Sequence, residues 1–150
     1  MSNRQKLKRI GRLIELRGRE RDRAHGELAT AQRATEVATL AVAAADRRWN
    51  DEAASDEAAA PNSVHEFGLR RMHLLSLRRE VDLAKERREV ALNAERLKLE
   101  AATHAQRELR KMEIWRESET ERQRVESELA DQHVTDEMAA RIVQSLTPNR

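Results

Sequence analysis

The sequence predicts an all-α protein, specifically a long antiparallel two-helix coiled-coil hairpin with arms of unequal length. Charged residues make up 37% of the 150 residues and aromatic residues 2%, so a thick globular core is not expected. Apolar residues recur at heptad spacing over long stretches. Turn-forming residues gather around one internal proline, Pro61. Disorder is the alternative, but charges of both signs are intermixed and the net charge is only +2.

The first helix is expected over residues 4–58. Its heptad seam departs from apolar character only at Arg17, Arg21 and Thr35. The seam consists of Leu7, Ile10, Ile14, Arg17, Arg21, Ala24, Leu28, Ala31, Thr35, Ala38, Val42, Ala45 and Trp49. A stripe of this width requires one partner helix.

The bend is expected at residues 59–63, around Pro61. The next residues, Ser63-Val64-His65-Glu66, fit a capping box. In this motif the serine hydroxyl accepts a backbone N–H of the first turn, and the glutamate reaches back to the cap. The second helix should therefore begin near Val64.

The second helix is expected over residues 64–145, with a looser stripe than the first. Its apolar residues are Leu69, Met72, Leu77, Val81, Ala84, Val90, Ala94, Leu97, Ala101, Ala105, Leu109 and Met112. Several irregular steps in this series predict stutters and a locally altered supercoil. Near the end, Thr135 either caps a short separate helix that stops at Pro148 or lies within one continuous helix.

A bend near residue 60 predicts which residues face each other across the hairpin. Trp49 should meet Met72, and Leu7 should lie near Ile114. Because the hairpin then satisfies its own seam, we expect a monomer in dilute solution. Small alanine side chains predominate in the middle of both stripes, so each layer buries little apolar area.

The two ends of the chain carry opposite charge. Residues 1–23 are rich in lysine and arginine, whereas residues 113–137 are rich in acids. An antiparallel hairpin places these segments together, while a parallel dimer would set the basic segment against its own copy. Arg17 and Arg21 are expected to extend from the seam towards acids of the second helix. Alternatively, a binding partner packs against this segment and completes the coiled coil.

The sequence offers little for catalysis. It has no cysteine, and its five histidines are never three or four residues apart, so neither a thiolate site nor a helical histidine pair is expected to bind metal. No phosphate-binding loop or nucleophile motif occurs. We therefore expect no enzymatic activity, no cofactor and no metal. The basic end lacks stacking aromatics, so nucleic acid is not the expected partner.

No hydrophobic signal core follows Met1, and no apolar run is long enough to span a bilayer, so a cytoplasmic protein without direct membrane insertion is expected.

The sequence also resembles a known family. The segments Leu13-Ile14-Glu15-Leu16-Arg17 and Glu27-Leu28-Ala29-Thr30-Ala31-Gln32, the bend near residue 60, the longer second helix and Asp136-Glu137-Met138-Ala139 are similar to the FliJ/YscO family. These are the stalk proteins of flagellar and injectisome type III secretion systems. The resemblance covers nearly the whole chain, and it rests mainly on length, unequal arms and bend position.

The resemblance implies a non-enzymatic stalk that resembles the γ stalk of rotary ATPases and lies peripheral to the inner-membrane export apparatus. The implied partners are a hexameric secretion ATPase, the export gate protein and secretion chaperones. The implied ATPase-binding residues are Leu7, Arg9, Arg12, Arg17, Met138 and Arg141. The implied gate-binding residues are Leu40, Trp49, Phe67 and Met72, although ordinary seam packing is the alternative for Trp49 and Met72. The alternative functions are a generic coiled-coil scaffold and a nucleic-acid-binding helical protein.

Overall fold

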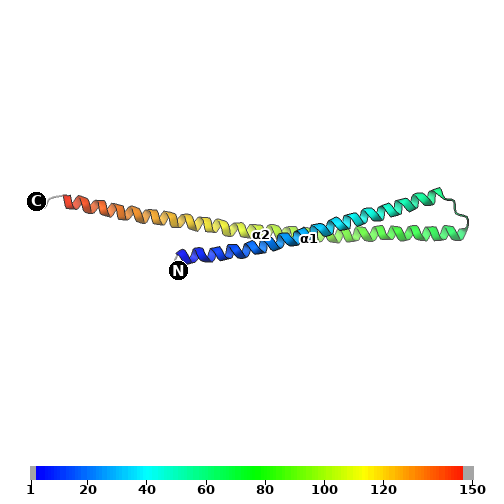
Figure 1. The fold of residues 1–150 in the computed structure, drawn as a ribbon, viewed down its shortest axis with the longest axis horizontal. Helices are drawn as coiled ribbons and strands as arrows, with labels where there is room; N and C mark the ends of the chain where they lie inside the picture. Colours follow the sequence, from blue (N-terminus) through cyan, green and yellow to red (C-terminus); the bar gives the residue numbers. More distant parts are fainter. Residues whose placement is uncertain (1–2, 147–150) are drawn as a thin grey trace. The chain divides into compact units, whose positions relative to one another are not determined.

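A computed structural model describes residues 3–146 as two helices, α1 (Asn3–Ala58) and α2 (Val64–Leu146), which pack against each other (Figure 1). The prediction of an all-α antiparallel hairpin with unequal arms is confirmed. Residue contacts divide the chain into two units. We call Arg21–His104 the bend unit, and Met1–Glu20 together with Ala105–Arg150 the chain-end unit.

The predicted capping box forms at the start of α2. The backbone N–H of Glu66 donates to the Ser63 hydroxyl at 3.1 Å, and the N–H of Phe67 donates to the Ser63 carbonyl at 3.0 Å. The Glu66 carboxylate reaches one residue further back than the motif requires, because it accepts the backbone N–H of Asn62 at 2.9 Å. The bond from Glu66 to the Ser63 hydroxyl satisfies one of the donors that the first turn of α2 leaves without a partner, and the bond from Asn62 holds the residue before the cap.

The heptad seam predicted for α1 is confirmed in the bend unit. Leu28, Val42 and Ala45 are buried, and every other predicted seam residue from Arg21 to Trp49 is half-buried. This includes the polar members Arg21 and Thr35. The unbroken alternation of three- and four-residue steps keeps α1 facing α2.

The seam predicted for α2 is wrong in its middle part. Val90, Ala94, Leu97 and Ala101 are all exposed, as are Leu69 and Met72 nearer the bend. The residues that do face α1 in the bend unit are Arg70, Leu74, Leu77, Val81, Ala84, Arg88, Ala91, Glu95, Lys98 and Ala102. Their spacing alternates between four and three without a stutter. The prediction assigned the most apolar residues of α2 to the seam. Helix α2 instead keeps the same unbroken heptad spacing as α1, because a stutter in one helix alone would turn its contact stripe away from the partner helix.

The predicted register is also wrong, by about one to two helical turns. In the bend unit, Lys98 Nζ donates to Glu27 Oε2 at 2.8 Å, and Arg48 Nη1 lies 3.5 Å from Glu80 Oε2. Trp49 therefore does not meet Met72, whose side chain is exposed. The bend is asymmetric, so the first turn of α2 lies beyond the end of α1, and each α1 residue faces a later α2 residue than a symmetric turn would give.

In the chain-end unit, Ile10 and Leu109 are buried between the helices. Lys6 Nζ donates to Glu119 Oε1 at 2.7 Å. Leu7 therefore lies level with α2 residues near Glu119 and not with Ile114, its predicted neighbour. Helix α2 continues through Thr135, whose hydroxyl donates to the Asp131 carbonyl within the helix at 2.9 Å.

Of the two alternatives for this segment, the continuous helix is therefore the one observed, and Pro148 lies outside the described residues.

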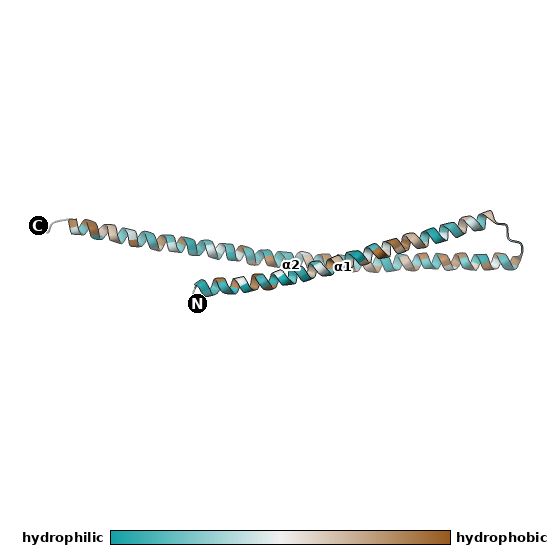
Figure 2. Ribbon diagram, in the orientation of Figure 1, coloured by the Kyte–Doolittle hydropathy of each residue, from teal (hydrophilic) through white to brown (hydrophobic). Residues whose placement is uncertain are grey.

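Hydrophilic and hydrophobic residues alternate along both helices (Figure 2). Over residues 3–146, neither helix is both long and apolar enough to cross a membrane.

Candidate protein-binding surfaces

The outer face of α1 in the chain-end unit is basic. Lys8, Arg9 and Arg12 are exposed and, with Gln5, line one hollow on the surface. They lie on the side of α1 that faces away from α2, because the seam of this helix runs through Leu7 and Ile10. Of the predicted ATPase-binding residues, Arg9 and Arg12 are thus presented to solvent.

Leu7 and Arg17 occupy different surroundings from these arginines, because both lie in the seam and are half-buried. The Arg17 Nη1 donates to Glu20 Oε2 at 2.8 Å. This hydrogen bond and the charge of Glu20 raise the pKa of Arg17, and Glu108 adds to the effect. The Arg17 Nε is buried and has no hydrogen-bond partner within the described residues. Arg17 thus pairs with an acid of its own helix, and Arg21 likewise donates to Asp22, whereas acids of the second helix were the expected partners of both arginines.

Met138 and Arg141 lie on a part of α2 that runs beyond the start of α1. Asn3, the first described residue of α1, donates to Glu126 at 3.3 Å and accepts from Gln123 at 3.2 Å. Met138 follows Glu126 by twelve residues, or roughly 18 Å of helix. The structure therefore does not bring Met138 and Arg141 next to Arg9 and Arg12.

This extension of α2 is exposed throughout, from Arg124 to Leu146. It nevertheless carries large apolar side chains on one face, since Val134, Met138 and Ile142 follow one another at four-residue spacing. Their side chains remain 53 to 61% exposed. An apolar stripe on an otherwise polar helix is typical of a surface that packs against another helix.

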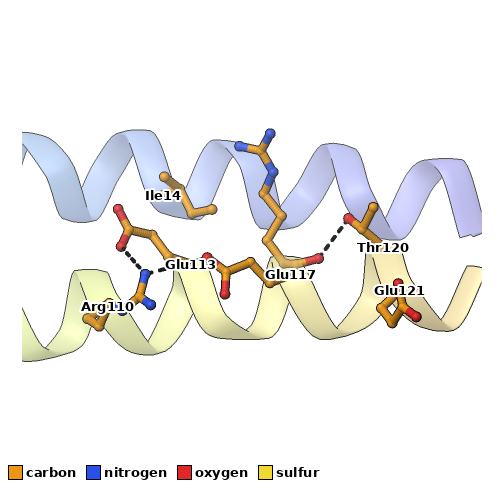
Figure 3. A pocket seen from close by; sticks show the side chains of 7 residues that line it. Ile14, Arg110, Glu113, Glu117, Thr120 and Glu121 are labelled. Carbon is orange, nitrogen blue, oxygen red and sulfur yellow. Dashed lines mark hydrogen bonds and ion pairs between the residues drawn. The ribbon is translucent and has the colours of Figure 1, made fainter.

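Polar contacts hold the start of α1 against α2. The hydrogen bond from Lys6 lowers the pKa of Glu119. Earlier in α2, Arg110 Nη1 donates to Glu113 and to Glu117, at 3.2 and 3.4 Å (Figure 3). Ile14 of α1 lines the same hollow. Of these pairs only Lys6–Glu119 joins the two helices, and it is part-buried, whereas the exposed Arg110 pairs lie within α2 and contribute little to stability.

The bend is held by Arg70, a residue that the sequence analysis did not identify. Its Nη1 donates to the Ala59 carbonyl at 2.7 Å, its Nη2 donates to Glu66 Oε1 at 2.6 Å, and Asp56 lies 3.8 Å away. One guanidinium thus joins the end of α1 to the first turn of α2. The only sequence signal was that Arg70 occupies a seam position, which becomes visible once the register is known.

The predicted gate-binding residues do not form one patch. Phe67 is 51% exposed and lines a hollow at the bend with Pro61 and Val64. Trp49 is half-buried in the seam, and the Arg78 guanidinium lies 5.5 Å from the centre of its ring. This position favours the structural alternative for Trp49.

The other two predicted gate-binding residues, Leu40 and Met72, are 64 and 69% exposed. The Arg48–Glu80 pair sets their levels about sixteen residues apart, or roughly 24 Å along the hairpin.

No family model matches the chain, and neither a curated protein nor a solved structure is significantly similar to it.

Proposed function

We propose that this chain is a non-enzymatic helical stalk or adaptor of a type III secretion export apparatus. In this proposal the chain-end unit binds the hexameric export ATPase, and exposed residues of the bend unit, including Leu40, Phe67 and Met72, serve the export gate and secretion chaperones. The protein would work in the cytoplasm, beside the inner membrane. The resemblance described above supplies the identity of these partners.

One observation supports the proposal most directly. Helix α2 extends beyond the first described residue of α1 and keeps an exposed apolar stripe, Val134, Met138 and Ile142, while the start of α1 presents Arg9 and Arg12. A binding partner that covers this end would bury apolar side chains and meet a basic face. The surface hollows beside Arg9, Ile14 and Phe67 are open, which suits binding to another macromolecule better than catalysis.

The test uses the full chain and the ATPase of a type III secretion system. A ligand that binds the assembled ring and not the separate subunits favours assembly by mass action, so we expect more ring and faster ATP hydrolysis. The double variant Arg9→Glu and Arg12→Glu should lose this stimulation. The matched control is Arg71→Glu and Arg79→Glu, which reverses the charge of two exposed arginines of the bend unit.

Circular dichroism must show that both variants remain helical. If the unmodified chain neither binds nor stimulates the ATPase, the stalk function is wrong. If the chain stimulates and the Arg9/Arg12 variant stimulates equally, the function stands, but the basic face of α1 is not the binding surface.

A generic coiled-coil scaffold is the second candidate. It is favoured by the number of large apolar side chains that remain exposed along both helices.

A further inference from the structure

Helix α2 carries a second heptad stripe that does not face α1. Leu83, Val90, Ala94, Leu97 and Ala101 are exposed and, with Arg87, follow one another in alternating steps of four and three residues. The side chain of Val90 is 70% exposed and that of Leu97 is 59% exposed. The same spacing in α1 marks the buried seam, so this stripe has the pattern of a coiled-coil contact without the contact.

Helix α1 has a matching stripe. Thr30, Ala34, Val37, Ala41 and Ala44 repeat at the same alternating spacing, and all are exposed. Val37 is the bulkiest and is 67% exposed. Both stripes lie wholly within the bend unit.

The two stripes lie on the same side of the hairpin. With the seam at heptad positions a and d, each stripe occupies positions g and c, and the g position directly precedes a. The Arg48–Glu80 pair, at 3.5 Å, joins two g positions. The g flank of α1 therefore lies beside the g flank of α2. The same register places Val37 level with Val90. The stripes therefore form one continuous apolar face over about four helical turns.

The angle between the stripes indicates what covers this face. In heptad geometry the second stripe lies about 100° around each helix from the seam. Neighbours of a helix are separated by about 60° in a three-helix arrangement and by about 90° in a four-helix bundle. Each helix is thus patterned for the square arrangement, in which a second layer of two helices, and not a single helix, covers the face.

The charges on the two edges of this face are opposite. Arg33 lies on the outer edge of α1, while Glu86 and Glu100 lie on the outer edge of α2. All three are exposed, and none has a hydrogen bond or ion pair within residues 3–146. A two-fold axis parallel to the helices places α1 of one copy over α2 of the other, with Arg33 between Glu86 and Glu100 of the second copy. The face is then complementary to itself, as an isologous dimer requires.

We propose that two copies of this chain associate through this face to form a four-helix bundle. We expected a monomer from the sequence because the apolar stripe of α2 was assigned to the seam of the hairpin. In the structure the part of this stripe through Val90 and Leu97 is exposed. Arg87 is the one charged member of the stripe, so its burial weakens the dimer. Arg47 and Arg79 lie just beyond the end of the face that Ala44 and Leu83 mark. In the dimer Arg47 of one copy meets Arg79 of the other, and this repulsion limits the contact to the apolar part of the face. This inference does not depend on the proposed export function.

Sedimentation equilibrium of the full chain tests the proposal through two neighbouring leucines. Leu97, which is 59% exposed, lies in the face, whereas Leu99, which is 53% exposed, lies on the opposite flank of α2. We expect the unmodified chain to dimerise, Leu97→Glu to weaken dimerisation at least about tenfold, and Leu99→Glu to leave it within about twofold. Arg87→Leu should tighten the dimer. The proposal fails if the unmodified chain is monomeric up to about 1 mM, or if the two leucine variants behave alike.

Disulfide trapping tests the arrangement, because the chain has no cysteine. Chains with Val37→Cys are mixed with chains carrying Val90→Cys and oxidised. The proposed axis brings residue 37 of one copy to residue 90 of the other, so the mixed disulfide should dominate over both symmetric ones. Predominance of either symmetric disulfide would rule out this packing. Stimulation of an export ATPase is a separate measurement, so failure of one proposal is distinguishable from failure of the other.

Discussion

The contact between Arg70 and the end of α1 leads to a specific prediction about stability. The guanidinium donates a charged hydrogen bond to the Ala59 carbonyl at 2.7 Å, and its side chain is only 28% exposed. Carbonyls at a helix C-terminus lack partners within the helix, and a cation there also interacts favourably with the helix dipole. Arg70 therefore stabilises the point at which the chain reverses.

Replacing Arg70 with methionine should lower the free energy of unfolding by about 1–2 kcal/mol. Methionine retains most of the apolar stem, so the loss is mainly that of a partly exposed, charge-assisted hydrogen bond. The matched control is Arg71→Met, since Arg71 is exposed and its neighbour. Urea denaturation followed by circular dichroism measures both variants. Equal midpoints for the two variants would refute the proposed role of Arg70.

The pH dependence of Glu66 tests the same bend independently. The hydrogen bond from the Asn62 backbone lowers the pKa of Glu66, and Arg70 lowers it further. Because the folded-state pKa lies below the unfolded value of about 4.3, ionised Glu66 stabilises the fold above that pH. This contribution is lost as the pH falls through the folded-state pKa. Glu66→Gln should therefore be less stable than the unmodified chain at pH 7, and the difference should narrow below about pH 4. A difference that is independent of pH would contradict this account.

Three further substitutions test the seam and the helix backbone by urea denaturation. Ile10→Ala should cost about 2–4 kcal/mol because Ile10 is fully buried, whereas Leu16→Ala, at a half-exposed site, should cost about 1 kcal/mol or less. Arg88→Leu should stabilise the hairpin by about 1 kcal/mol, because the Arg88 Nε is buried without a partner within the described residues, while the exposed Arg96→Leu should change little. Gly18→Ala should add up to about 1 kcal/mol, because nothing lies within 4 Å of the added methyl group. Equal effects at Ile10 and Leu16, no gain at Arg88, or a loss at Gly18 would each contradict the structure.

The sequence was sufficient to predict helix α1 and the bend. In α1 the heptad stripe with the larger apolar residues runs from Leu7 to Trp49, and even Arg17 and Thr35 keep its phase. Pro61 and the Ser63 cap fix where the chain turns. Each of these signals is local, so no knowledge of the partner helix was needed.

Helix α2 was harder to predict because it contains two stripes of comparable regularity. The stripe through Val90 and Leu97 is the more apolar, but α1 contacts the one through Arg88, Glu95 and Lys98. The phase of α2 is the one that keeps it against the seam of α1. Contacts such as the one from Arg70 to Ala59 depend on that phase, so they appear only once the register is known.

The distribution of residues between these two stripes bears on what the hairpin does. A stable isolated hairpin would place Val90 and Leu97 in its seam, because each buried aliphatic side chain contributes about 1.5–3 kcal/mol. Helix α2 instead places Arg88 and Lys98 there, and the Arg88 Nε has no hydrogen-bond partner within the described residues. The seam is consequently weak, while the stronger apolar stripe remains available for contact with another chain. Such an arrangement ties the stability of the hairpin to its association, since a partner that binds only the folded form stabilises it by mass action.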